Sequence, residues 1–307
     1  MTAILGITFP IFAAIALGYG LVRWQVFRSA DMRVLGGYVM QIALPALIFN
    51  AVASRDIGEV FNLPYMTAFL LGGLVTMGIA FGWFSAITGP QRRAVGAMGA
   101  TVPNSGFIGA PMMLILFPDI AGLILAMNML VENVILIPLA LALIEAAKGG
   151  GFHLGKVLLG VLRRPMVIGL IVGLVVSVLG VTLPAPLTRL IDMIAGSAAP
   201  IALIVIGGSL AGLAVKGNRA LAAQIAVAKL VVHPLVTLAA ITLLGLVGLG
   251  LGGDLRVALI LSTAVPMFTI YTVLAQESGH EGLASLALLV ATVASFVTLN
   301  VAIFLLI

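Results

Sequence analysis

The sequence predicts an all-α polytopic membrane protein with ten transmembrane helices, arranged as two five-helix repeats of opposite orientation. Three observations predict this fold. Hydrophobic residues make up 62% of the 307 residues and charged residues only 8%, which excludes an ordinary soluble domain. Ten apolar stretches reach the ~17–25 residues that a membrane-spanning helix needs. Two of these stretches carry helix-breaking prolines in matching positions.

The ten predicted spans follow one another with short connectors. The first repeat, residues 1–145, holds spans at 3–22, 34–53, 64–88, 94–117 and 120–145, and the second, residues 166–307, holds spans at 166–183, 190–214, 220–247, 256–276 and 283–306. Between the repeats lies a Gly-rich, basic connector, residues 146–165, which is too short to be a domain. The chain is therefore predicted to be a single membrane domain. Its first span lacks a basic leading segment and a clear cleavage site, so we expect a retained helix and not a signal peptide.

Basic residues gather in alternate connectors and predict the orientation. The connectors after spans one, three, five and seven hold Arg23, Arg28, Arg33, Arg92, Arg93, Lys148, Lys156, Arg163, Arg164, Lys216 and Arg219. The opposite connectors hold only Arg55, Arg189 and Arg256. The positive-inside rule places the larger group in the cytoplasm and both termini on the outer, periplasmic side of the plasma membrane. We interpret the net charge of +5 as a consequence of this topology and expect no nucleic-acid binding.

The prolines of spans four and nine indicate the repeat. Pro103 follows Arg93 by ten residues, and Pro266 follows Arg256 by ten residues. Because the charge rule puts Arg93 inside and Arg256 outside, the two spans run in opposite directions. An inverted repeat of this kind is typical of secondary transporters.

The segment Pro-Asn-Ser-Gly at residues 103–106 predicts a helix break near the middle of the membrane. Pro103 has no amide hydrogen, and it disfavours helical dihedral angles at the residue before it. Ten helical residues rise ~15 Å, about half of a ~30 Å hydrocarbon layer, and unpaired backbone at that depth needs protein or a water-filled cavity beside it. Two crossing broken helices would direct the N-termini of their half-helices at such a cavity, which suits a carboxylate. The alternative is that neighbouring helices simply accommodate two proline kinks.

The candidate substrate-binding residues are the polar and helix-breaking residues near this depth. They are Pro103, Asn104, Ser105, Gly106, Asn50, Asn128, Pro266, Thr269 and Tyr271. Asn50 ends span two, and Asn128 lies one helical turn before Glu132 on the same face. Each of these two asparagines could line a cavity or bond to a neighbouring helix.

Two ionisable residues, Glu132 and Lys229, also lie near the middle of their spans. A charge at that depth costs at least ~2.5–3.5 kcal/mol, so each needs a partner, and their opposite signs predict that they pair. The pair could be a permanent brace between two helices, or it could couple protons to transport. His233, four residues after Lys229, is interpreted as a hydrogen-bonded structural residue. Because the sequence has no cysteine, metal-ligand cluster, phosphate loop or nucleophile motif, we expect no cofactor, no metal and no enzymatic activity.

Three ordered motifs carry a family resemblance. They are Leu44–Phe49 (LPALIF), Asn104–Pro111 (NSGFIGAP) and Ala199–Leu203 (APIAL), the last followed by Gly207–Leu210 (GGSL). With these motifs the chain resembles the auxin efflux carrier family over essentially its whole length, and within it the bacterial branch that includes malonate transporters.

The resemblance implies the ten-helix fold shared with bile-acid/sodium symporters and sodium/proton antiporters. Spans one, two, six and seven would form a scaffold that is often dimeric, and spans three to five and eight to ten a moving core in which spans four and nine cross. Glu132 sits where related antiporters carry a carboxylate, and Lys229 matches their lysine more loosely. The resemblance thus implies an elevator-type transporter of a small organic anion, malonate-like or auxin-like. A sodium-coupled symporter of the same fold, an anion channel and a membrane enzyme are the competing hypotheses.

Overall fold

The structure, a computed structural model, is helical throughout the residues that it describes. These are residues 2–53, 55, 57–149, 155, 160–213, 217–276 and 278–307. They contain no β-strand, and their one isolated β-bridge joins Pro103 to Met267. The all-helical prediction is confirmed. Lys156 and most of the predicted connector 146–165, together with Lys216, lie outside the described residues.

Six helical segments are long and apolar enough to cross a membrane. They are Ser29–Ala53, Leu63–Ile87, Ala121–Ala147, Ala185–Ala211, Arg219–Leu246 and Glu281–Leu306, and each coincides with a predicted span to within a few residues. Shorter apolar helices cover Thr8–Arg23, Ser105–Leu116 and Pro165–Val178. The described residues therefore support a polytopic membrane protein, while the count of ten spans and the inverted repeat remain predictions.

The chain divides into two compact units. Unit 1 comprises Met1–Asn62, Ser105–Leu130 and Leu159–Gly212, and unit 2 comprises Leu63–Asn104, Val131–Leu158 and Leu213–Ile307. Two of the boundaries fall inside predicted spans four and five. The predicted assignment of whole spans to a scaffold and a core remains a prediction.

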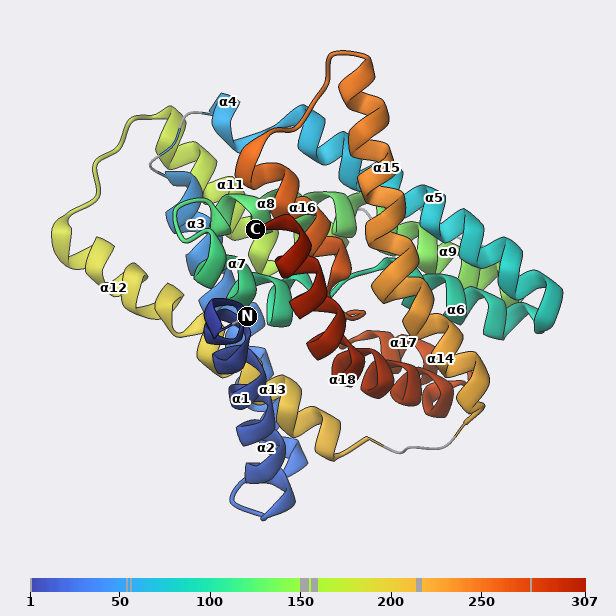
Figure 1. The fold of residues 1–307 in the computed structure, drawn as a ribbon. Coiled ribbons are helices and arrows are strands. Elements are labelled where there is room, and N and C mark those ends of the chain that lie inside the picture. Colours follow the sequence, from blue (N-terminus) through green and yellow to red (C-terminus); the bar gives the residue numbers. More distant parts are fainter. Residues whose placement is uncertain are drawn as a thin grey trace. The chain divides into compact units, whose positions relative to one another are not determined.

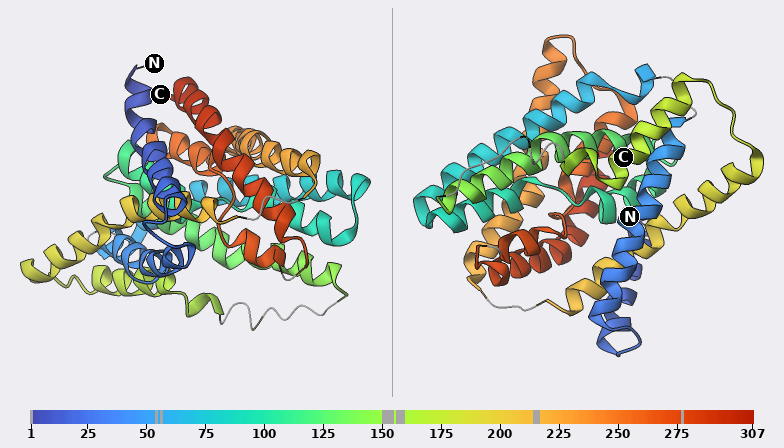
Figure 2. Two further views of the ribbon diagram at one scale, coloured as in Figure 1. Left: turned by 90° about the horizontal axis from the view of Figure 1, so that it is seen from below. Right: turned by 180° about the vertical axis from the view of Figure 1, so that it is seen from behind.

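Unit 1 is built from pairs of closely packed helices. It holds α1 (Thr2–Arg23), α2 (Ser29–Tyr38), η1 (Val39–Ala43), α3 (Leu44–Ala53), α4 (Ile57–Val60), η2 (Ser105–Gly109), α7 (Ala110–Leu116), all but the last residue of α8 (Ala121–Val131), α11 (Pro165–Val178), α12 (Ala185–Gly196) and α13 (Ala198–Ala211). Helix α1 packs along α13, and α3 along α11 (Figure 2). A Cβ on Gly207 would lie 1.8 Å from the Ile15 carbonyl oxygen, so α1 and α13 touch backbone to backbone.

Unit 2 holds the longest continuous helices. Its elements are α5 (Leu63–Ile87), α6 (Pro90–Thr101), η3 (Glu132–Leu136), α9 (Ile137–Ala147), α14 (Arg219–Val227), η4 (Ala228–Val232), α15 (His233–Leu246), α16 (Gly253–Ala264), α17 (Tyr271–Gln276) and α18 (Glu281–Leu306). Helix α5 packs on α6 and α15, and α14 on α18 (Figure 1). A Cβ on Gly72 of α5 would lie 2.3 Å from the Thr237 Oγ1 atom of α15, so a glycine is required at this contact.

The segments η1 to η4 are five-residue π-helical turns, and each precedes a proline. The prolines are Pro45, Pro111, Pro138 and Pro234, each at the second residue after its wide turn. A proline ring clashes with the carbonyl group four residues earlier in an α-helix. In all four cases that carbonyl belongs to the wide turn, which gives the ring room and lets the helix continue past it.

Candidate functional site

Two helices of unit 2 stop at the predicted breaks. Helix α6 ends at Thr101, and Val102 is extended, with φ −77° and ψ 112°. Helix α16 ends at Ala264, and Val265 is extended, with φ −68° and ψ 155°. Both valines precede a proline, which disfavours the helical conformation there. The two prolines thus end their helices, as the sequence predicts.

The two breaks pair with each other. The Asn104 backbone amide donates a hydrogen bond to the Pro266 carbonyl oxygen, with an N–O distance of 2.8 Å. The Phe268 amide donates to the Val102 carbonyl oxygen at 3.2 Å, which completes the antiparallel bridge between Pro103 and Met267. Buried backbone groups need partners, and here each broken segment supplies them to the other. The breaks therefore form one crossing and are not two independent kinks.

Three polar side chains of the predicted set lie at or beside this crossing. The Asn104 side-chain Nδ2 donates to Thr269 Oγ1 at 3.1 Å, and Asn104 is only 2% exposed. The Tyr271 ring packs against Gly99 of α6, where a Cβ would lie 2.7 Å from the phenol oxygen. The buried Tyr271 hydroxyl has no hydrogen-bond partner among the described residues. The crossing thus brings together the Asn104 amide, the Thr269 hydroxyl and the Tyr271 phenol, of which the phenol has no partner in the described part of the chain.

Lys229 holds the end of α16 next to the crossing. Its fully buried Nζ donates a hydrogen bond to the Thr263 carbonyl oxygen at 2.5 Å and lies 3.0 Å from His233 Nδ1. Thr263 is the penultimate residue of α16, and the last carbonyl groups of a helix carry partial negative charge and lack partners within the helix. Lys229 therefore caps α16 where the helix breaks. Sequence reasoning missed this contact, although a buried cation beside a helix that ends in mid-membrane could have suggested it.

Glu132 lies in η3, is 2% exposed, and interacts electrostatically with Lys229. The two Lys229 hydrogen bonds within the described chain go to Thr263 and His233. Lys229 therefore stabilises the end of α16 and also interacts with the negative charge of Glu132. Whether these two residues brace the core or couple protons remains a prediction.

The other predicted site residues belong to unit 1. Ser105 and Gly106 are buried in η2, and Asn128 is buried in α8. The Asn50 side chain donates a hydrogen bond to Asp192 Oδ1 of α12 at 2.6 Å. Both residues line a cavity of about 340 Å³, which Arg55 and Asp119 also line. A role of these residues in substrate binding remains a prediction.

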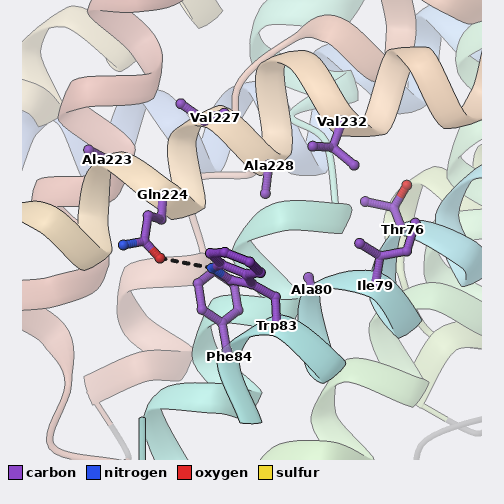
Figure 3. A pocket seen from close by; sticks show the side chains of 10 residues that line it. All are labelled: Thr76, Ile79, Ala80, Trp83, Phe84, Ala223, Gln224, Val227, Ala228 and Val232. Atoms are coloured by element: carbon purple, nitrogen blue, oxygen red, sulfur yellow. Dashed lines mark hydrogen bonds between the residues drawn. The ribbon is translucent and has the colours of Figure 1, made fainter. Parts of the chain in front are cut away.

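A second cavity lies within unit 2, between α5 on one side and α14 with η4 on the other. It has a volume of about 360 Å³ and is lined by Thr76, Ile79, Ala80, Trp83, Phe84, Ala223, Gln224, Val227, Ala228 and Val232 (Figure 3). The Trp83 Nε1 group donates to Gln224 Oε1 at 2.9 Å at one end, and Thr76 lies at the other. The cavity contains none of the predicted site residues. The described residues also contain no cluster of three side chains that could hold a metal ion.

Comparison with known proteins finds similarity over the whole chain. A family profile described as "Membrane transport protein" matches residues 3–303. A protein of Rhizobium meliloti named "Putative malonate transporter" is 28% identical over 98% of this chain and 95% of its own length. The "Uncharacterized transporter YfdV" of Escherichia coli is 25% identical over 76% of this chain and 77% of its own length. "Auxin efflux carrier component 2" of Arabidopsis thaliana is 26% identical over 47% of this chain and 23% of its own length.

The profile covers nearly every residue, from the first helix to the last, and therefore includes both breaks and the crossing that they form. The relatives named above include a bacterial chain of similar length and a plant auxin efflux carrier. This chain belongs to the membrane transport protein family that includes the auxin efflux carriers.

Proposed function

We propose that this protein is a secondary active transporter of a small organic anion, a mono- or dicarboxylate, that works by alternating access across the plasma membrane. The crossing of the two breaks carries the proposal. In a membrane transport family, two helices that stop and exchange backbone hydrogen bonds, from Asn104 to Pro266 and from Phe268 to Val102, favour a substrate site at that point.

Two further observations support a carboxylate as the substrate. The relatives are named for malonate and for auxin, which are both small carboxylates. The Asn104 amide and the Tyr271 hydroxyl are donors that can hydrogen-bond a carboxylate, and the Tyr271 hydroxyl has no partner among the described residues. In the proposed complex these two groups, with Thr269, bind the substrate.

The proposal includes the predicted architecture. Ten spans form an inverted repeat with both termini outside, the scaffold spans form a homodimer, and the core moves as one body. The Lys229 bond to the Thr263 carbonyl supports this rigid motion, because it ties η4 to the break in α16. Glu132 and Lys229 are proposed to couple the motion to protons.

The proposal is tested with purified protein in liposomes loaded with a panel of mono- and dicarboxylates. We expect saturable counterflow of at least one labelled carboxylate, and accumulation when a proton gradient is imposed. Protein-free liposomes are the control. Flux that never saturates and shows no counterflow would indicate a channel and overturn the proposal. Accumulation driven by a sodium gradient alone would support a transporter that is coupled to sodium instead of protons.

A further inference from the structure

Three buried polar atoms between α5 and α15 have no hydrogen-bond partner among the described residues. They are Thr76 Oγ1 on α5, and His233 Nε2 and Thr237 Oγ1 on α15. All three residues are fully buried in unit 2. A buried polar group without a hydrogen-bond partner is destabilising, so a set of three indicates a bound molecule that supplies the missing bonds.

The packing of the helices brings these atoms to one strip of the interface. Gly72 of α5 faces Thr237, because a Cβ on this glycine would lie 2.3 Å from the Thr237 hydroxyl. Further along, Trp83 bonds to Gln224 of α14 and Ala80 shares a cavity with Ala228 of η4. Because α14, η4 and α15 follow one another as one helical segment, this segment runs antiparallel to α5. Thr76 is one turn after Gly72, and His233 is one turn before Thr237. From this register we infer that Thr76 and His233 lie opposite each other, next to the Thr237 hydroxyl.

The contact with Lys229 bears on which His233 nitrogen carries the proton. While Lys229 is an ammonium group it can only donate, so His233 Nδ1, at 3.0 Å, accepts its hydrogen bond. The neutral ring then carries its proton on Nε2. This N–H group is the donor that lacks an acceptor in the described chain. A water molecule can accept from it while bonding to the Thr76 and Thr237 hydroxyls, which gives the two to four partners that a buried water needs.

The cavity within unit 2 reaches this strip at Thr76. Thr76 lines the cavity together with Val232, the residue before His233 (Figure 3). The cavity volume of about 360 Å³ is many times that of one water molecule, which is about 30 Å³ in the liquid.

We propose that His233 passes protons between Lys229 and a water molecule bound by Thr76 and Thr237. In the forward step the Lys229 ammonium gives one proton to His233 Nδ1, and the ring releases its Nε2 proton to the water. Lys229 is left as a neutral amine, His233 as the Nδ1–H tautomer, and the proton as hydronium. This inference rests on the proposed proton coupling and adds the residue that connects Lys229 to water.

The charged groups around this relay come from the elements packed on η4 and α15. Helices α6, α14 and α18 pack on η4 and carry Arg92 and Arg93, Arg219 and Glu281, each in the first turn of its helix. Lys229 is the charged group of η4, and Glu132 acts on it electrostatically. Helix α5 contributes Tyr65 as its only titratable side chain, and α16 contributes Asp254 and Arg256 in its first two turns, at the end opposite Thr263.

The first test needs no substrate. Protein labelled with ¹⁵N-histidine contains three histidines, His153, His233 and His280, and the spectrum of His233→Gln assigns the His233 signals by difference. At neutral pH we expect the Nε2–H tautomer of His233, with magnetisation transfer between this proton and water. A proton on Nδ1, or an Nε2 proton without contact to water, would overturn the proposal.

The second test separates a bound water from three unsatisfied atoms. Thr76→Val with Thr237→Val keeps the side-chain shapes but removes both hydroxyls. If water is bound, the double variant should lose proton-driven accumulation and gain no thermal stability. If the site is dry, valine should raise the melting temperature and leave transport unchanged, since it replaces unpaired hydroxyls. The second outcome would refute the relay. Thr242→Val is the control, because this exposed α15 hydroxyl bonds to the Leu238 carbonyl.

Substrate exchange distinguishes a failure of the relay from a failure of the proposed function. His233→Gln should retain counterflow of the carboxylate and lose accumulation driven by a proton gradient, whereas a purely structural histidine would impair both together. If wild-type protein shows no carboxylate counterflow, the proposed function fails, and the tautomer and water measurements still decide whether the site exists.

Discussion

The contact between Lys229 and the crossing predicts how the stability of unit 2 depends on its two buried charges. Lys229→Met removes the donor to the Thr263 carbonyl and leaves the Glu132 carboxylate buried without its cation. Stranding one member of a buried charge pair costs ~3–5 kcal/mol. Adding Glu132→Gln removes the stranded charge, but the Thr263 carbonyl still lacks its donor, at a cost of ~1–3 kcal/mol. The double variant should therefore recover only part of the lost stability.

The measurement is a double-mutant cycle on the free energy of unfolding, taken from denaturant titrations in nanodiscs. We expect a coupling energy of about 2 kcal/mol between Glu132 and Lys229, within the range for interacting neighbours. The control pair is Glu145 and Lys148, whose Oε1 and Nζ atoms lie 3.0 Å apart on the surface. Their coupling should stay below about 0.5 kcal/mol because solvent screens them. Additive effects at Glu132 and Lys229 would refute the claim that the two charges stabilise each other.

Three further predictions concern packing, orientation and pH. Gly207→Ala should lower the free energy of unfolding by about 1–3 kcal/mol, because its Cβ would collide with the Ile15 carbonyl. The control Gly78→Ala should not destabilise the protein, because a Cβ at Gly78 meets nothing within 4 Å. Equal effects of the two substitutions would contradict the backbone contact of α1 and α13. In this cysteine-free chain, Gln91→Cys should react with an impermeant reagent only from the cytoplasm and Gly250→Cys only from outside, and the reverse pattern would invert the topology. Burial and the positive charge of Arg92 lower the pKa of His280, so the unfolded chain binds a proton that the folded chain does not, and stability should fall as pH drops below about 6.5. His280→Gln should flatten that pH dependence in unfolding titrations, and an unchanged slope would show that His280 does not cause it.

The breaks could be predicted from sequence because proline acts locally. Pro103 and Pro266 constrain the residue before them whatever surrounds it, and both helices end there. The hydrogen bonds that pair the two breaks could not be predicted from local sequence patterns. The pairing depends on hydrogen bonds between residues more than 160 positions apart, such as that from Asn104 to Pro266, which no local pattern encodes.

The partners of Lys229 show a second limit of sequence reasoning. Depth in the membrane and charge predicted a carboxylate partner, and Glu132 does act on Lys229 electrostatically. Charge patterns do not include backbone carbonyl groups, so the bond to Thr263 was missed. The wide turn η4 was missed for a related reason, because Pro234 could equally have ended or kinked its helix.

The most direct test of the proposed carboxylate site at the crossing is the concentration dependence of counterflow in wild-type, Asn104→Ala and Asn300→Ala protein. Asn104 lies at the crossing and is buried, whereas the half-buried Asn300 bonds to the Phe296 carbonyl of its own helix and serves as the control. Losing one hydrogen bond to a charged ligand costs ~1.5–3 kcal/mol, so Asn104→Ala should weaken carboxylate affinity about 10- to 150-fold. Asn300→Ala should retain the wild-type affinity. Unchanged affinity in folded Asn104→Ala protein would contradict a substrate site at the crossing.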